Sequence, residues 1–165
     1  MPPRFVADGM LGRLAKWLRA LGFDVVYRPF ADDRELVAWA REGEAILLTR
    51  DTGLAKTPGV QIIFITDDHL EKQLRQVVSE APLDLRQAAP LTRCTVCNEA
   101  LVTATREEVR DQVPPYVYLT QERYARCPGC GRIYWEGTHV GRMRARLAEL
   151  LAAVTVSDQE GPDLV

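Results

Sequence analysis

The four cysteines of this chain form two C-x2-C pairs, and their spacing constrains the fold of the second half more than any other feature. The pairs are Cys94 with Cys97 and Cys127 with Cys130, and 29 residues separate them. Each pair fits a tight turn that directs two thiolates at one tetrahedral ion. The sequence therefore predicts a zinc ribbon with one structural zinc per chain, and a longer hairpin in the interval between the pairs.

Two other uses of these cysteines fit the sequence less well. Disulfides are typical of exported proteins, and the N-terminal MPPRFVADG lacks the apolar segment of a signal peptide. A redox C-x-x-C opens a helix after a strand, which CPGC at 127–130 does not do, and it leaves the other pair unexplained. His139 is an alternative zinc ligand, and a surface or packing role is its other interpretation.

The first half of the chain alternates short apolar segments with segments of helical period, in the order of an α/β domain with a parallel sheet. The strands are expected at residues 4–7, 24–27, 45–48 and 60–65. The apolar run 45–48 shows little alternation, as expected where helices cover both faces of the sheet. The expected boundaries are 1–82 for the α/β domain, 83–91 for a linker, 92–154 for the ribbon with a C-terminal helix at about 140–153, and 155–165 for a flexible tail.

The overall composition is that of an ordinary globular protein of 165 residues with a net charge of −2. No apolar run approaches the ~20 residues of a membrane-spanning helix, so we expect a cytoplasmic protein without membrane contact. Positive charge is concentrated locally, because residues 1–31 carry five Lys or Arg against two Asp or Glu. Local binding of nucleic acid is compatible with this distribution.

Aspartates lie at every expected strand-to-helix junction. They are Asp8 after the first strand, Asp32 and Asp33 after the second, Asp51 after the third, and Asp67 and Asp68 after the fourth. Each one alone is a good helix N-cap. Because ligands bind outside the carboxyl ends of parallel strands, the set together indicates a site for Mg²⁺ or Mn²⁺, which suits hydrolysis of a phosphodiester.

Basic and aromatic side chains have both functional and structural interpretations. Arg13, Lys16 and Arg19 are expected on the helix face opposite its leucines, where they contact RNA phosphate or only solvent. Arg50 neutralises the acidic site, binds phosphate or lies in solvent. Tyr134 and Trp135 either stack on bases or form the small core of the ribbon, and the second role is favoured.

Four segments together resemble one known family. They are FVADGMLGRLAKWLRALGFDVVY, DDRELVAWAREGEAILLTRD, CTVCNEAL and CPGCGRIYWEGTHVGRM. They resemble the RNase domain named after the C-terminal part of the Mut-seven exonuclease, in which a PIN-like domain is fused to a zinc ribbon. The resemblance extends from about Phe5 to Met143. It implies a three-layer α/β/α fold and a metal-dependent ribonuclease, expected to be an endonuclease, that acts on single-stranded RNA.

The resemblance also implies roles for individual residues. Asp8, Asp33 and Asp51 match the metal-binding acidic residues, and both Asp67 and Asp68 fit the fourth position. In many PIN domains the second acidic residue is a glutamate inside the helix, whereas here it is an aspartate near the helix start. A homodimer, a regulatory protein partner, a non-catalytic RNA-binding or adaptor module, and an enzyme acting on another phosphate ester remain alternatives.

Overall fold

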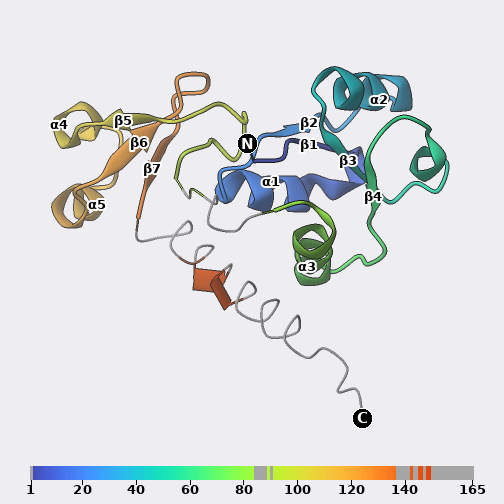
Figure 1. Cartoon of the computed structure of the whole chain (residues 1–165). Helices are drawn as coiled ribbons and strands as arrows, with labels where there is room; N and C mark the ends of the chain where they lie inside the picture. The colour runs from blue at the N-terminus through green and yellow to red at the C-terminus, as the bar shows by residue number, and fades with distance from the viewer. Residues whose placement is uncertain are drawn as a thin grey trace, which may run out of the picture.

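Two separate sheets organise the chain, one of four strands and one of three (Figure 1). They are seen in a computed structural model that describes residues 2–83, 89, 91–136, 142, 145–146 and 148–149. The four-stranded sheet belongs to the first half of the chain and the three-stranded sheet to the second. The boundary at 82, the linker 83–91 and the end of the ribbon at 154 stay predictions.

The first sheet is entirely parallel, with the strand order β2-β1-β3-β4. Its strands are β1 (Phe5–Ala7), β2 (Val25–Tyr27), β3 (Ile46–Thr49) and β4 (Ile62–Phe64). Every residue of the two central strands is buried, which explains why their sequences show so little alternation. The predicted parallel α/β sheet is confirmed.

Helices cover both faces of this sheet. They are η1 (Gly9–Leu11), α1 (Gly12–Ala20), α2 (Asp33–Glu42), η2 (Leu54–Lys56) and α3 (Leu70–Glu80). Phe5 and Ala7 of β1 pack with α1 and α3 in one cluster. Val6 points the other way and packs with α2 and η2 in a second cluster. This alternation of β1 side chains confirms the predicted three-layer α/β/α arrangement.

Asp32 and Asp33 have different roles at the start of α2, and only Asp33 has a carboxylate that is free of capping. Asp32 is the N-cap, because its carboxylate accepts the backbone N–H of Glu35 at 2.9 Å. Glu35 in turn accepts the backbone N–H of Asp32, which completes a capping box. Asp33 is the first helical residue, and its carboxylate has no capping role.

The second sheet is antiparallel, in the order β5-β6-β7. Its strands are β5 (Val102–Ala104), β6 (Tyr124–Arg126) and β7 (Ile133–Trp135). Two short helices, α4 (Arg106–Val109) and α5 (Pro115–Thr120), lie between β5 and β6. The predicted longer hairpin is thus formed by the antiparallel pair β5 and β6, with α4 and α5 in its connection. Thr105 and Glu108 form a capping box and Pro115 occupies the first helical turn, both recognised helix-start signals.

The second sheet and its helices share a small apolar core. Its buried members are Ala104, Val109, Val113, Val117 and Tyr124. Trp135 packs against them, which supports its predicted structural role. His139, most of the predicted C-terminal helix at 140–153 and the tail at 155–165 lie outside the described residues.

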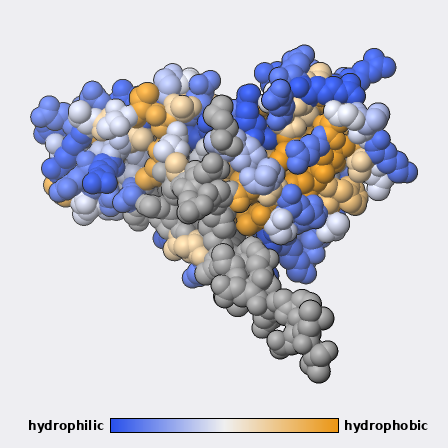
Figure 2. Space-filling view, viewed as in Figure 1, coloured by the Kyte–Doolittle hydropathy of each residue, from blue (hydrophilic) through white to orange (hydrophobic). Residues whose placement is uncertain are grey.

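The surface seen in Figure 2 is hydrophilic over most of the ribbon and the outer helices, with an apolar area on the α/β domain. Among the helices of the described ranges, none is long and apolar enough to cross a bilayer.

Arg19 connects the first sheet to the first cysteine turn, and its placement differs from the prediction. Its side chain is only 5% exposed. Nε and Nη2 donate to the carbonyl oxygen of Val25 in β2 at 3.0 and 2.8 Å. Nη1 donates to the carbonyl oxygens of Thr95 and Val96, in the first cysteine turn, at 3.2 and 3.0 Å. The expectation that Arg19 lies on an exposed RNA-binding face with Arg13 is wrong, because β2 and the first cysteine turn cover its side chain and bind its guanidinium group.

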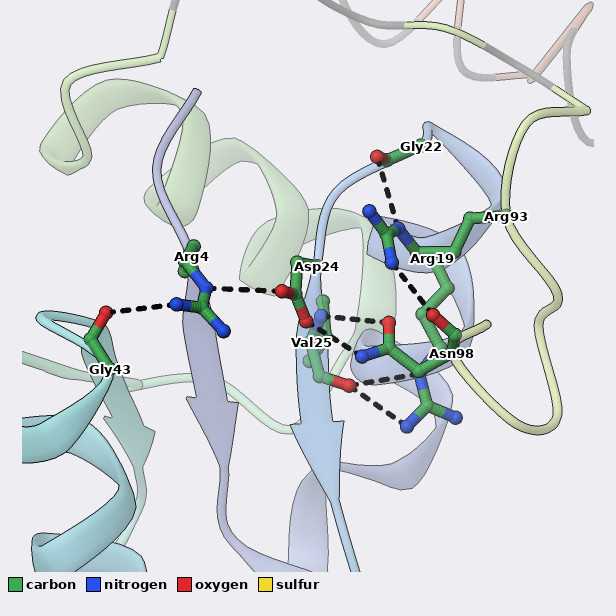
Figure 3. A network of polar contacts seen from close by, with 8 residues as sticks. All are labelled: Arg4, Arg19, Gly22, Asp24, Val25, Gly43, Arg93 and Asn98. Atoms are coloured by element: carbon green, nitrogen blue, oxygen red, sulfur yellow. Dashed lines mark hydrogen bonds and ion pairs between the residues drawn. The ribbon is translucent and has the colours of Figure 1, made fainter. Parts of the chain in front are cut away.

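Asn98 reinforces this contact from the end of the first cysteine turn (Figure 3). Its Oδ1 accepts the backbone N–H of Val25 at 3.0 Å, and its Nδ2 donates to Asp24 Oδ1 at 2.7 Å. Arg93 donates to the Asn98 carbonyl oxygen at 2.7 Å. Since β2 is an edge strand of the first sheet, the ribbon covers an edge that would otherwise be open to other strands.

Replacing Asn98 with glycine is expected to destabilise the α/β domain. Asn98 has a positive φ of 69°, which glycine tolerates, so Asn98→Gly removes the side chain without backbone strain. The buried Val25 N–H then lacks its acceptor, and the free energy of unfolding in urea should fall by about 1–3 kcal/mol.

A matched control is Val96→Ala, because Val96 is 52% exposed and contributes only its carbonyl oxygen to Arg19. Equal urea midpoints for the two variants would contradict the assignment of Asn98.

Candidate metal centres

The four cysteine sulfurs converge on one point. All four Sγ atoms lie within 4.8 Å of one another. The Cys94–Cys130 and Cys97–Cys127 Sγ distances are both 3.8 Å, far longer than a disulfide bond. A tetrahedral ion with Zn–S distances of about 2.3 Å requires sulfurs about 3.8 Å apart. The geometry therefore fits four thiolate ligands of one ion, as the spacing predicts.

Surrounding donors support negative charge on these sulfurs. The backbone N–H of Cys97 faces Cys94 Sγ at 3.4 Å, and that of Cys130 faces Cys127 Sγ at 3.5 Å. The hydroxyl of Tyr134 lies 3.1 Å from Cys94 Sγ. Burial raises the pKa of Tyr134 to about 12, so the phenol keeps its proton and can donate it. Tyr134 thus contacts the cysteine group through its hydroxyl.

Asp8 and Asp51 lie at the carboxyl ends of the neighbouring central strands β1 and β3. Asp8 accepts the backbone N–H of Gly9 at 2.6 Å. Asp51 Oδ1 accepts the backbone N–H groups of Gly53 and Leu54 at 2.7 and 3.1 Å. One oxygen of Asp51 therefore caps the turn into η2, while its Oδ2 makes no hydrogen bond to the described part of the protein. The two interpretations of Asp51, cap and ligand, are compatible.

Thr49 links these two aspartates, although it is not among the candidate site residues predicted from the sequence. Its side chain is fully buried. Oγ1 donates to Asp8 Oδ2 at 2.9 Å and accepts the backbone N–H of Asp51 at 2.9 Å. The sequence feature that indicates such a role is a buried polar residue at the end of the otherwise apolar strand Ile46–Thr49.

Asp33 is electrostatically coupled to this pair. Its pKa is raised above the ordinary value, first by desolvation and then by the negative charges of Asp51, Asp8 and Asp32. A divalent cation among these groups would remove the repulsion. The structure thus brings Asp8, Asp33 and Asp51 into one acidic group at the predicted edge of the sheet.

The acidic group is open. Within the described residues, Asp8, Asp33 and Asp51 are not among the sets whose ligand atoms all lie within 4.8 Å of one another. Mg²⁺ usually keeps several waters and takes only one or two carboxylates directly. The residues therefore fit a partly hydrated cation better than a closed cage of protein ligands.

Asp67 and Asp68 lie in a different group, with His69. Asp67 Oδ1 accepts the backbone N–H of His69 at 2.8 Å and contacts its Nδ1 at 2.9 Å. These bonds, chiefly the backbone one, lower the pKa of Asp67 to about 2. Asp68 Oδ1 lies 3.0 Å from the same Nδ1. No hydrogen bond or ion pair between described residues joins this group to Asp8 or Asp51, so a fourth carboxylate from this group stays a prediction.

Basic side chains also lie near this end of the domain. Arg13 and Lys16 are exposed on α1, and Arg50 is half-buried directly before Asp51. Arg13 lines a pocket of about 550 Å³ between α1 and the start of α3, together with Trp17 and Arg75. No described carboxylate lies within ion-pair distance of Arg13 or Arg75. Because the carboxylates of Asp68 and Glu71 line the same pocket, its charge is mixed.

Replacing Thr49 with valine is expected to weaken binding of Mn²⁺ by the acidic group. Valine keeps the shape but removes the hydroxyl that orients Asp8. Loss of such a supporting partner costs about 10–100-fold in metal affinity, which isothermal titration with Mn²⁺ measures.

Thr49→Ser, which keeps a hydroxyl, should restore most of the affinity, and Thr52→Val is the control at an exposed position. Unchanged Mn²⁺ affinity in Thr49→Val would show that Thr49 does not position a ligand.

Comparison with known proteins agrees with these features. The family model described as the Mut7-C RNAse domain matches residues 3–147. The matched region begins before β1 and ends beyond β7, so it includes both sheets and both candidate metal centres. Neither a curated protein nor a solved structure matches the chain. The chain belongs to the Mut7-C RNAse domain family.

Proposed function

We propose that this protein is a metal-dependent ribonuclease that hydrolyses RNA phosphodiester bonds at the acidic group of Asp8, Asp33 and Asp51. The observation that carries the proposal is the hydrogen-bonded link Asp8–Thr49–Asp51, with Asp33 coupled to it by charge. These residues lie where ligands bind in parallel α/β sheets, in a chain of an RNase domain family.

Mg²⁺ or Mn²⁺ bound there would supply a Lewis acid that acidifies water and neutralises charge on the phosphoryl group. The protein orients the carboxylates that would hold the cation. Thr49 and the Gly9 N–H fix both oxygens of Asp8, and the backbone N–H groups of Gly53 and Leu54 fix one oxygen of Asp51. Asp33 completes the negative charge that attracts a cation. Without a bound cation, the three carboxylates at this edge of the sheet would repel an anionic substrate.

The basic residues nearby are proposed to hold the RNA backbone. Arg13 and Lys16 present exposed charges on α1, which begins four residues after Asp8, and Arg50 adjoins Asp51. Charge on the backbone of RNA is recognised by such side chains whatever the base sequence. We expect affinity for RNA to fall as salt rises.

The cysteine group is proposed to hold one structural zinc. Four sulfurs complete a tetrahedral coordination sphere and leave no position for substrate. Zinc would fix the turn whose carbonyl oxygens, of Thr95 and Val96, bind Arg19. The ribbon therefore supports the α/β domain, and a direct contact with RNA is a further possibility for its surface.

Metal analysis tests the zinc proposal. Purified protein should contain one zinc per chain, and Cys94→Ser should lose it and unfold at a lower temperature, since Arg19 then lacks a fixed partner. A variant that keeps its zinc and its melting temperature would contradict the proposed ligand set.

A cleavage assay on single-stranded RNA of mixed sequence with Mn²⁺ tests the catalytic proposal. Asp8→Asn and Asp51→Asn should each reduce cleavage by more than the roughly 10–100-fold that loss of a supporting partner causes. The melting temperature of Asp51→Asn should not fall, because one oxygen is enough for its hydrogen bonds and like-charge repulsion is removed. In Asp8→Asn the same relief offsets the loss of one of the two hydrogen bonds that the carboxylate accepts, so only a small change is expected.

The control is Asp111→Asn, an exposed aspartate between α4 and α5, purified identically to exclude contaminating nuclease. Equal cleavage by all four proteins would show that the acidic group is not the active site. Binding of RNA without cleavage would favour a non-catalytic binding module, and cleavage of another phosphate ester alone would favour a different substrate.

A further inference from the structure

Phe30 has the highest exposed fraction among the large apolar side chains of the described residues. It is 98% exposed, in the loop between β2 and α2. Single exposed apolar residues are common and need no explanation by themselves. Phe30 differs because a hydrogen-bonded turn holds its backbone and because the acidic group of Asp8, Asp33 and Asp51 adjoins that turn.

The backbone that carries Phe30 is held in a defined turn. The backbone N–H of Ala31 donates to the carbonyl oxygen of Arg28 at 3.2 Å, so Pro29 and Phe30 are the two corner residues. Proline at the first corner fixes the backbone there. The Arg28 guanidinium lies over the Trp39 ring of α2, 5.2 Å from its centroid. The ring of Phe30 is thus presented to solvent from an ordered support.

This turn adjoins the acidic group on both sides. On one side, a Cβ at Gly9 would lie 2.7 Å from the carbonyl oxygen of Pro29, so the two loops touch. The Tyr27 hydroxyl donates to the Gly9 carbonyl oxygen at 3.0 Å and holds them together. On the other side, the chain runs directly into Asp32 and Asp33. Phe30 therefore lies between a neighbour of Asp8 and Asp33 itself.

A second exposed apolar side chain lies on η1, which faces this turn. Met10, the residue after Gly9, is 73% exposed. Gly9 and Pro29 are in contact, and the residue after each of them exposes a large apolar side chain. Apolar side chains are thus displayed beside a strongly acidic, cation-seeking group. Phosphate would be drawn to the cation, and the attached base, which is uncharged, matches the apolar side chains.

We propose that Phe30 is a stacking platform for an unpaired nucleobase next to the phosphate bound at the acidic group, with Met10 as an additional apolar contact. The proposal rests on the proposed ribonuclease function of that group. An aromatic ring stacks on any base whose face is free, whereas in a duplex neighbouring base pairs cover these faces. The platform therefore favours single-stranded RNA at this position without reading its sequence.

Binding of a short fluorescent single-stranded RNA, measured by anisotropy, tests the platform. Ca²⁺, which also takes oxygen ligands, replaces Mn²⁺ to slow cleavage, and a gel checks that the RNA stays intact. Phe30→Ala should weaken binding roughly 5- to 100-fold, the range of stacking losses on alanine substitution. Phe30→Trp should bind like the wild type. Tyr116→Ala, which removes a 61% exposed aromatic in α5 of the ribbon, is the control.

A 2-aminopurine placed in turn at each position of the RNA identifies the stacked base. One position should lose fluorescence on binding to wild type but not to Phe30→Ala. Removing the base at that position should weaken binding to wild type and leave Phe30→Ala unaffected.

The outcomes separate this inference from the proposed function. Normal Mn²⁺-dependent cleavage with equal RNA affinity of wild type and Phe30→Ala overturns the platform and leaves the ribonuclease in place. Failure of wild type to bind RNA overturns both. An equal loss in Tyr116→Ala also overturns the platform, since the effect is then not confined to this site. Melting temperatures of all variants should match that of the wild type, because Phe30 is almost fully exposed.

Discussion

The guanidinium group of Arg19 joins the parallel sheet to the first cysteine turn, and the position of the ribbon against the α/β domain depends on it. It is buried, and burial lowers its pKa, so its charge requires partners within the protein. Those partners are main-chain carbonyl oxygens of β2 on one side and of the first cysteine turn on the other. The turn is shaped by Cys94 and Cys97. The ribbon that carries the four cysteines and the α/β domain are thus joined at a buried charge.

This contact is connected to the acidic group through a single strand. The ribbon holds β2 at Val25, through Asn98 and Arg19. At the other end of β2, Tyr27 bonds to Gly9 beside Asp8. The loop after Tyr27 carries Phe30 and leads to Asp33. The position of these groups relative to Asp8 therefore depends on β2, and the ribbon stabilises the position of β2.

Much of the fold and the acidic group could be predicted because the signals are local. Apolar runs that stop at aspartates mark parallel strands, and the geometry of such sheets gathers Asp8 and Asp51 at one edge. Arg19 could not be placed from helical period, since its partners lie 76 and 77 residues away in sequence. Thr49 was passed over as the end of a strand, because its role appears only when β1 lies beside β3. Asp67 and Asp68 follow their strand as expected, yet bind His69 instead.

The contact between the ribbon and the α/β domain uses main-chain atoms on the ribbon side at Thr95 and Val96. Any residue supplies a carbonyl oxygen, so these two positions can change during evolution with little effect on the contact. Arg19 and Asn98 contribute through their side chains and have no such freedom. Divergent members of the family should therefore differ within the C-x2-C turn while retaining an arginine near the end of the first helix. Variation at the two positions between the cysteines should therefore be neutral for this contact, whereas loss of the arginine should separate the ribbon from the α/β domain.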